Sequence, residues 1–335
     1  ATCVMNYDGA IGHLVGEENN GLKAMFKMMN EARLQVAMQG HGQSVISYQN
    51  AATYAKERLQ GRSLTGAKFP DKAADPIIVH PDVRRNLMDI KSFNEAARAF
   101  ILWTALNSDL KNRSKDEIQQ EEASDLLELL TPVLKAFITD KSFDNCVKAQ
   151  QVFGGHGYIK EWGMEQYVRD ARIMQIYEGA NGVQALDLVG RKLAINNGRS
   201  VRLFFTRIND FTKKHMANEA MQPFCKPLRE ANKALEAATL WLMQNGMKNP
   251  DNAGAASTDY LHLMGHVTLG YMWALMSEAA LQKLDDGDAA NKEFYENKLK
   301  TSLYYFDRVL PQVQTHLTCI QAGSNAMMAL EADAF

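Results

Sequence analysis

The spacing of apolar residues along most of the chain predicts helices. From Leu22 almost to the end, apolar residues recur every three or four positions, as on one face of an α-helix. Breaks rich in glycine, proline or charge divide this pattern, and Pro81 stands where a helix would begin. Pro132 is expected near the start of a helix or at a kink. The predicted helices span residues 22–59, 81–106, 126–153, 164–177 and 183–194.

The last 135 or so residues follow the same helical pattern after a break at residues 196–200 (NNGRS). About five further helices are predicted there, separated by residues 245–257, by residues 285–288 and by Pro311. The beginning of the chain differs. Residues 2–21 carry short apolar stretches between DG and NNG turn signals, so we expect one or two strands followed by a turn.

Composition excludes several classes of function. The formal net charge of the 335 residues is −2, which gives no global field for nucleic acid or an anionic membrane. No apolar run reaches the roughly 18–20 residues that span a bilayer, so membrane insertion is not expected. The four cysteines lie far apart, which argues against structural zinc or a disulfide framework and favours a reducing, cytoplasmic location. The chain does not begin with Met, and we expect a processed or truncated product.

The stretch IYEGANGVQ, residues 176–184, places a single carboxylate between two predicted helices. In one interpretation, Asn181 caps the second helix with Gln184 in capping-box spacing, and Glu178 interacts with the helix dipole. In the other, the apolar neighbours of Glu178 desolvate its carboxylate and make it a base near neutral pH. Gly179 would then let a ligand approach the backbone closely.

Two motifs upstream of this junction, together with the junction itself, decide between the two interpretations. The segment QVFGGHGY at residues 151–158, the helix RDAR at 169–172 and the junction YEG at 177–179 occur in this order. Together they resemble the acyl-CoA dehydrogenase family, and residues 15–37 resemble its passage from the β-domain into the C-terminal helical domain. The resemblance covers roughly residues 1–195. The HPDVRR loop at residues 80–85 and the extra C-terminal part are similar to a bacterial subgroup with an appended domain.

The resemblance implies a mainly all-α fold in three parts. The end of a β-domain is expected at residues 1–19, the family's C-terminal helical bundle at 20–196 and an appended helical bundle at 197–335. Because the family has further domains before this point, which supply the main flavin contacts, we expect this chain to be a fragment that is inactive alone. The appended domain could cover the CoA end of the substrate or extend a subunit interface.

The resemblance also implies the chemistry. In the family, the glutamate at the position of Glu178 removes the α-proton of an acyl-CoA thioester. The β-hydrogen leaves as hydride to N5 of FAD, and a trans-2-enoyl-CoA results. The flavin ribityl and the backbone amide of Glu178 would donate hydrogen bonds to the forming enolate. The implied partners are an acyl-CoA, an electron-transfer flavoprotein as electron acceptor, and further copies of the chain in a homodimer or homotetramer.

The family's cofactor contacts carry over to three segments. A segment that contacts the FAD of a partner subunit matches Gln151, Val152, Phe153, Gly154 and Gly155. Arg58 matches an arginine that binds the flavin pyrophosphate, with Gln60 nearby as a looser match; without the resemblance, the position of Arg58 favours a solvated charge at a helix end. Residues that touch FAD after the base match Ala180, Asn181 and Gly182. Many members carry a hydroxyl and a glutamine there, so Ala180 and Gly182 depart from the pattern.

The substrate contacts are predicted at four residues. Asn30 and Arg33 match a stretch that contacts the CoA part, although Asn30 replaces a common aspartate and Arg33 could instead form an ion pair within its helix. Tyr177 would line the acyl pocket or else belong to the core, and Gly179 would allow the thioester to approach. The identity of the acyl group does not follow from the sequence.

The sequence also allows two alternatives to a dehydrogenase, and one pair of histidines raises the question of a metal site. An acyl-CoA oxidase would use the same base and flavin, and a non-catalytic interaction module would keep only the fold. His262 and His266 lie at i,i+4 spacing in HLMGH, but a zincin motif requires glutamate directly after the first histidine, and Leu263 is there. We therefore predict no metal site.

Overall fold

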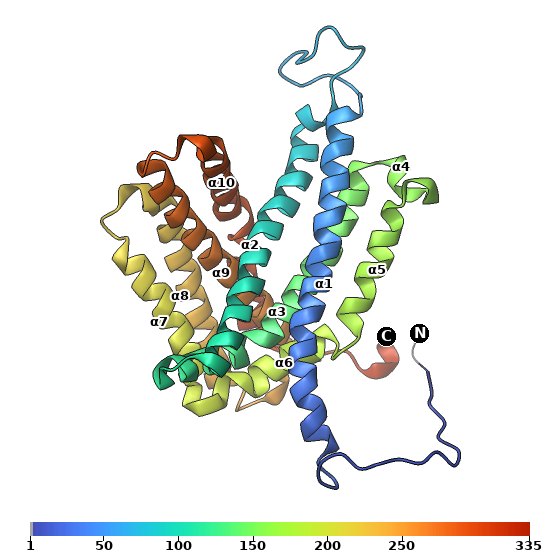
Figure 1. The fold of residues 1–335 in the computed structure, drawn as a ribbon, viewed down its shortest axis with the longest axis vertical. Coiled ribbons are helices and arrows are strands. Elements are labelled where there is room, and N and C mark those ends of the chain that lie inside the picture. The colour runs from blue at the N-terminus through green and yellow to red at the C-terminus, as the bar shows by residue number, and fades with distance from the viewer. Residues whose placement is uncertain (1–2) are drawn as a thin grey trace.

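The computed structural model describes residues 3–335 and is built from helices (Figure 1). The first group comprises α1 Gly21–Glu57, α2 Pro81–Arg113, α3 Glu117–Val152, α4 Gly155–Tyr158, α5 Met164–Ile176 and α6 Asn181–Gly190. The second comprises α7 Arg199–Lys214, α8 Gln222–Asn245, α9 Pro250–Asp285, α10 Lys292–Tyr304 and α11 Gln312–Ala322. Short 3-10 segments lie at Ile77–Val79, Lys160–Trp162, Lys192–Gly198, Glu219–Met221, Ala289–Asn291 and Ala332–Ala334, and a π-helical turn at Tyr305–Val309.

The helices α1, α2, α3 and α5 form the first bundle. α1 packs along α3, α2 packs against both, and α5 lies against α1 and α3 on the other side. In Figure 1, α1 runs through the middle of the molecule, with a long loop, residues 58–80, beyond its upper end. α3 is central to this bundle because one run of its residues, from Leu129 to Ile138, is almost entirely buried.

The second group of helices, α7–α11, packs directly against the first. One continuous cluster of buried apolar residues includes Phe100 of α2, Phe137 of α3, Phe204 of α7 and Trp273 of α9. The indole Nε1 of Trp273 also donates a hydrogen bond to the backbone carbonyl of Ser92, at 3.0 Å. The two groups therefore share a single core, although Figure 1 shows them diverging toward the top of the view.

Most of the predicted helices agree with the structure to within a few residues, but α3 begins earlier than expected. The sequence predicted a start at residue 126, whereas the helix begins at Glu117 with Asp116 as its N-cap. The carboxylate of Asp116 accepts hydrogen bonds from the backbone N–H groups of Ile118 and Gln119. Pro132 consequently lies inside the helix rather than near its start.

The strands expected near the N-terminus are absent from the part of that segment that is described. Residues 3–20 run as an exposed, irregular segment, and Figure 1 shows it extending away from the helices. Residues 1 and 2 lie outside the described residues. A strand is stable only when its backbone pairs with another strand, and residues 3–335 contain just one isolated bridge, between Leu59 and Pro76.

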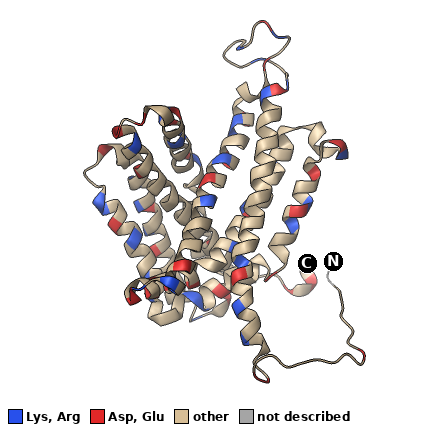
Figure 2. Ribbon diagram, in the orientation of Figure 1, with Lys and Arg blue, Asp and Glu red and all other residues tan. Residues whose placement is uncertain are grey.

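Charged residues of both signs are spread along the chain. Figure 2 shows basic and acidic positions interspersed along the helices of both groups. Within residues 3–335, no helix is both long and apolar enough to cross a membrane.

Candidate active site

Glu178 lies in the short connection between α5 and α6. α5 ends at Ile176 and α6 begins at Asn181. Glu178 and Gly179 both adopt left-handed backbone conformations, with φ of 58° and 88°. For a residue with a side chain, that region is rare and costs on the order of 1–3 kcal/mol when the surroundings impose it. The fold thus holds Glu178 in a conformation that the residue itself disfavours.

Gly179 is required by the close packing of this turn. A Cβ at this position would lie only 2.4 Å from Nε2 of Gln184, in the first part of α6. The amide of Gln184 is itself fully buried, so it has little room to move. The turn is therefore pressed against α6, and a side chain at position 179 would collide with the side chain of Gln184.

Several polar atoms around the turn are buried but have no hydrogen-bond partner within residues 3–335. They are Oε2 of Glu178, Nε of Arg33 and both amide atoms of Gln184. The guanidinium of Arg33 also approaches Gly179, 3.8 Å from where its Cβ would be. Buried polar groups are almost always paired in native proteins. Unpaired donors and acceptors gathered at one turn indicate a place where a polar ligand completes the bonding.

The backbone amide of Glu178 is also available. Among the described residues, its N–H donates to no carbonyl or side chain, whereas the N–H of the preceding Tyr177 is bonded to Ile173, at 3.1 Å. An unused amide beside a carboxylate is the arrangement that proton abstraction next to a carbonyl requires. The carboxylate takes the proton, and the N–H can donate to the oxygen that becomes negative.

Arg33 reaches the turn from α1. Nη1 of Arg33 donates a hydrogen bond to Oδ1 of Asn30 at 3.3 Å, so its partner within the helix is this amide rather than an acid. Desolvation lowers the pKa of Arg33, and Arg191 acts in the same direction, whereas Asp187 and Glu178 oppose the shift. Asn30 is exposed on the same face. The two residues predicted to contact the substrate therefore lie together, with Arg33 adjacent to Glu178.

Lys135 supports the turn from α3. Its side chain is fully buried, and its Nζ donates to the backbone carbonyl of Gly179 at 2.9 Å and to Oδ1 of Asn181 at 2.7 Å. Desolvation lowers the pKa of Lys135 to about 8; Arg33 adds to this effect, and Asp140 and Glu178 oppose it. A buried ammonium thus binds the backbone on the C-terminal side of Glu178.

The predicted capping box is wrong. The residue before α6 is Ala180, with no side-chain cap, and the side-chain amide of Gln184 has no hydrogen-bond partner among the described residues. Asn181 instead turns its side chain toward α3, where Nδ2 donates to Asp140 at 2.6 Å and to Thr139 at 2.9 Å. These bonds are stronger than a cap to exposed backbone because one acceptor is a carboxylate.

The three residues predicted to touch the cofactor after the base, Ala180, Asn181 and Gly182, differ in which groups they leave free. Asn181 is committed to α3 through its side chain. Ala180 and Gly182 are exposed and could offer only backbone groups.

Tyr177 is half-buried, and its hydroxyl donates to Oε1 of Gln39 on α1. Desolvation raises the pKa of Tyr177, and the charge of Glu178 adds to the shift.

The other predicted cofactor residues line one cleft of about 600 Å³ at the opposite end of the bundle. The guanidinium of Arg58 makes no hydrogen bond or ion pair within residues 3–335, and Gly154 turns with a φ of 58° in open space. A free arginine beside an exposed glycine turn fits an anionic group such as a pyrophosphate. The residues that line this cleft include Arg58, Gln60, Gln151, Val152, Phe153, Gly154 and Gly155.

The long loop that borders this cleft is organised around Asp75. Its carboxylate is buried and accepts hydrogen bonds from the backbone N–H groups of Ser63, Lys68 and Phe69. Desolvation alone would raise its pKa, but these three hydrogen bonds and the charge of Arg62 outweigh that effect and lower the pKa to about 2. The loop is thereby ordered, and it holds Gln60 beside Arg58.

The cleft and the Glu178 turn lie far apart on one chain. Lys135, which bonds to Gly179, and Gln151, which lines the cleft, are 16 positions apart on α3. At a rise of about 1.5 Å per residue this separation is about 24 Å along the helix. The side chains at the turn therefore cannot contact those that line the cleft.

The two histidines of HLMGH do not form a metal centre with other residues. Nε2 of His262 contacts Oδ2 of Asp140 at 3.0 Å, and His266 is buried with neither ring nitrogen bonded within the described residues. Among residues 3–335 no group of three or more histidine, cysteine, aspartate or glutamate side chains could hold a metal ion.

Two family profiles match almost the whole chain. The profile described as acyl-CoA dehydrogenase, C-terminal domain, matches residues 19–193, which is more than half of the sequence. The chain belongs to the acyl-CoA dehydrogenase family. A second profile, described as acetyl-CoA dehydrogenase C-terminal like, matches residues 204–331. The family prediction from the QVFGGHGY, RDAR and YEG motifs is thus confirmed.

Curated relatives match both groups of helices. The chain is 36% identical over 333 residues to the 3-methylmercaptopropionyl-CoA dehydrogenase of Ruegeria pomeroyi, a match that covers 98% of this chain and 55% of the relative. It is 29% identical to the broad-specificity linear acyl-CoA dehydrogenase FadE5 of Mycobacterium tuberculosis, covering 100% of this chain and 57% of the relative. The chain therefore spans about half the length of these relatives.

Solved structures of the family share the fold. An acyl-CoA dehydrogenase of Bacillus anthracis, complexed with FAD, aligns over 91% of this chain and 51% of its own, with a TM-score of 0.71 and 18% identity. The Caenorhabditis elegans protein ACDH-11, in complex with C11-CoA, aligns over 88% of this chain and 45% of its own, with a TM-score of 0.70 and 17% identity. The mainly all-α fold class predicted from the sequence is confirmed.

Sequence reasoning missed two residues that shape the turn, Lys135 and Asp140, and it assigned a capping role to a third, Gln184. Lys135 and Asp140 lie in the apolar-rich stretch of α3, where a charged residue on a buried face was a usable signal. No signal distinguished the buried amide of Gln184 from a capping residue, because both require the same spacing after Asn181.

Proposed function

We propose that the protein containing this chain is an FAD-dependent acyl-CoA dehydrogenase and that Glu178 is its general base. The observation that supports this most is the turn itself. An unpaired carboxylate oxygen and an unused amide N–H come from one residue that is held in a strained backbone conformation. Strain of this kind is concentrated at functional sites.

In this proposal, each residue at the turn has a separate role in the reaction. Oε2 of Glu178 accepts the α-proton of the acyl thioester, and the backbone N–H of Glu178 donates to the thioester oxygen as negative charge develops there. Arg33 lies beside the carboxylate and would contact the CoA part, with Asn30 on the same helix face. Gly179 leaves room for the thioester. When bound, FAD supplies the acceptor for the β-hydrogen, which leaves as hydride, so that a trans-2-enoyl-CoA is formed.

The cofactor would be held by residues of the cleft. The unpaired guanidinium of Arg58 suits the pyrophosphate, Gln60 and Gln151 can donate side-chain hydrogen bonds, and the turn at Gly154 exposes backbone. Because this cleft is about 24 Å along α3 from the turn, we propose that it serves the flavin of a partner subunit. A homodimer or homotetramer follows from that arrangement.

Further features of the protein are proposed from its relatives. An acyl-CoA is the substrate class in the names of the relatives, and a caffeyl-CoA reductase–Etf complex subunit of Acetobacterium woodii, 32% identical over 180 residues, supports an electron-transfer flavoprotein as partner. We also propose that residues 20–196 and 197–335 are the family's C-terminal domain and an appended domain. The chain spans about half of its relatives, so we propose that activity requires the remaining domains.

The function is tested by the Glu178→Gln variant of the full-length, flavin-loaded protein. A series of acyl-CoAs is added without oxygen, and the long-wavelength absorbance of the flavin is followed. We expect the wild type to bleach with at least one acyl-CoA and the variant to bleach at least 10³-fold more slowly, because the amide cannot accept the proton. The exposed Glu293→Gln change is the matched control.

The other outcomes identify the alternatives. Equal bleaching of wild type and Glu178→Gln would mean that the base lies elsewhere. A reduced enzyme that returns rapidly to the oxidised state in air, with production of peroxide, would indicate an oxidase. Failure of the full-length protein to bind flavin would favour a non-catalytic module.

A further inference from the structure

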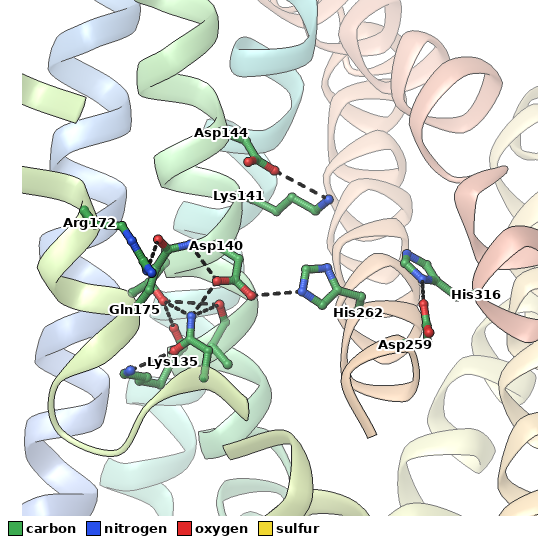
Figure 3. Close-up of polar contacts among 12 residues, drawn as sticks. Lys135, Asp140, Lys141, Asp144, Arg172, Gln175, Asp259, His262 and His316 are labelled. Carbon is green, nitrogen blue, oxygen red and sulfur yellow. Dashed lines mark hydrogen bonds and ion pairs between the residues drawn. The ribbon is translucent and has the colours of Figure 1, made fainter. Parts of the chain in front are cut away.

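Asp140 of α3 connects the second group of helices to the Glu178 turn. Its Oδ2 contacts Nε2 of His262 on α9 at 3.0 Å, and its Oδ1 accepts hydrogen bonds from Nδ2 of Asn181 at 2.6 Å and from Nε2 of Gln175 at 2.8 Å. Figure 3 shows Asp140 between Gln175 on one side and His262 on the other. A single carboxylate thus receives hydrogen bonds from α5, α6 and α9.

The two partners of Oδ1 flank the base symmetrically in sequence. Gln175 is three residues before Glu178, in the last turn of α5, and Asn181 is three residues after it, at the first position of α6. Bonds from both sides to one oxygen fix the ends of the connection relative to each other. Lys135 adds a third bond, to the carbonyl of Gly179. These hydrogen bonds support the left-handed backbone conformation of Glu178, which a residue with a side chain does not favour on its own.

His262 contributes to the orientation and the ionisation of Asp140. Both side chains are largely shielded, at 22% exposure for Asp140 and 13% for His262. Desolvation alone would raise the pKa of Asp140, but His262, Asn181 and Gln175 together outweigh it, and the pKa is lowered. Without His262, Oδ2 loses the only donor that it has among the described residues. The carboxylate could then rotate, and the bonds of Oδ1 to Gln175 and Asn181 would weaken.

We propose that the second group of helices, α7–α11, positions the catalytic base, with His262 as the positioning residue that acts through Asp140. The inference rests on the proposed role of Glu178. It gives the second group a part in catalysis in addition to its share of the core. His262 does not lie at the reacting atoms, so its loss lowers the rate of proton removal and leaves the contacts of Arg33 and Asn30 with CoA unchanged.

The expected effect is on kcat rather than on KM. Displacements of about 1 Å at a reacting group can cost on the order of 10²-fold in rate. We expect His262→Leu to lower kcat about 10- to 100-fold and to change KM by less than about threefold. The His262→Gln variant places an amide nitrogen near the position of Nε2 and can still donate to Asp140, so it should recover most of the rate.

The chain offers a matched control in a second histidine–aspartate pair. Nδ1 of His316 on α11 contacts Oδ1 of Asp259 on α9 at 2.8 Å, entirely within α7–α11. The ring of His316 lies beside that of His262, with 5.7 Å between their centroids, but Figure 3 shows that neither His316 nor Asp259 bonds to Asp140. His316→Leu removes a comparable interaction from the same group of helices, and we expect it to leave kcat within about twofold of the wild type.

A second readout does not depend on activity. Hydrogen–deuterium exchange of the backbone is measured for residues 173–186 in the full-length protein without substrate. His262→Leu should speed exchange in this segment several-fold, while His316→Leu and His262→Gln should not. If His262→Leu unfolds the protein, Asp140→Asn takes its place. The Asn side chain keeps its volume but loses the charge that both Asn181 and Gln175 bind, so it should give the same loss of kcat and the same faster exchange.

The outcomes separate this proposal from the proposed function. The proposal is overturned if His262→Leu behaves like His316→Leu in both measurements, or if His262→Gln is as impaired as His262→Leu. In either case Glu178→Gln, measured in parallel, would still abolish flavin bleaching. If Glu178→Gln itself has no effect, the proposed base is wrong, whatever the exchange of residues 173–186 shows.

Discussion

The carboxylate of Glu178 is surrounded by cations that do not bond to its Oε2. Arg33 and Lys135 are both close enough for the charge of Glu178 to act on their pKa values. Their hydrogen bonds, however, go to Asn30, Asn181 and the carbonyl of Gly179. Arg33 and Lys135 therefore offset the negative charge of Glu178 without a hydrogen bond to Oε2, whose lone pairs remain available for a proton.

The buried ammonium of Lys135 gives a pH-dependent prediction. Its pKa is lowered from 10.5 to about 8, first by desolvation, so the folded protein releases this proton at lower pH than the unfolded chain does. Between about pH 8 and 10.5, unfolding takes up the proton, and the wild type gains stability as the pH rises. Lys135→Met lacks this contribution, and it also leaves two acceptors unpaired, at about 1–3 kcal/mol each.

Denaturant unfolding of wild type and Lys135→Met at pH 7, 8, 9 and 10 measures this effect. The variant should be less stable at pH 7, and the difference between the two free energies of unfolding should widen above pH 8. Lys283→Met is a suitable control, because Lys283 is mostly exposed and its amine lies 3.9 Å from Asp286. A constant difference over the whole pH range would show that Lys135 titrates normally.

At the residue scale, the sequence predicted which residues lie at the turn better than it predicted the direction of their side chains. Glu178, Arg33 and Gly179 were singled out from a motif and its neighbours, and the structure brings all three together. The direction of a side chain depends on partners that are distant in the chain. Asn181 turns away from its predicted capping position because Asp140, 41 positions earlier, offers a charged acceptor. Local spacing contains no information on that partner.

At the scale of the elements, apolar periodicity located the long helices because each has one face in the core. It failed at the start of α3, where residues 117–125 carry mostly polar and charged side chains and only the cap at Asp116 marks the helix end. It also predicted strands at the N-terminus, where the described residues 3–20 have no neighbouring strand to pair with. Both errors concern features that do not depend on a buried apolar face: one is a helix start that is set by its cap, and the other is a strand that needs a pairing partner.

The contact between α3 and α9 depends on a glycine. A Cβ at Gly265 of α9 would lie 2.3 Å from Cγ of Phe137, a ring on α3 that is itself almost fully buried. Gly265→Ala should therefore push the two helices apart. We expect it to destabilise the protein by about 1–3 kcal/mol, although alanine favours helix by about 1 kcal/mol. Because α9 carries His262, turnover should also fall.

Thermal or denaturant unfolding measures the effect of Gly265→Ala, with Gly254→Ala on the same helix as the control. A Cβ at Gly254 meets no atom within 4 Å, so there the propensity of alanine should dominate, and the change should be neutral or stabilise by up to about 1 kcal/mol. Equal stability changes at both positions would show that α9 does not pack tightly against Phe137.

At the scale of the whole molecule, the proposed base and the cleft proposed for the flavin lie far apart on one chain. The turn with Glu178 is next to Arg33 on α1, whereas the cleft is lined by Tyr54, in the last turn of the same helix. The 21 positions from Arg33 to Tyr54 correspond to about 32 Å. Neither group of residues can complete the other within a chain. If both serve one flavin, the second half must come from another copy.

Mixed dimers of two inactive variants test this arrangement. One subunit carries Glu178→Gln and lacks the base, and the other carries Arg58→Glu and repels the pyrophosphate. If each active site takes Glu178 from one chain and Arg58 from its partner, one site of the mixed dimer contains both changes and the other contains neither. Dimers purified through two different affinity tags should then recover about half of the wild-type flavin and activity, while each homodimer remains inactive. Were each site built from one chain alone, every site in the mixed dimer would carry one change, and no activity would return.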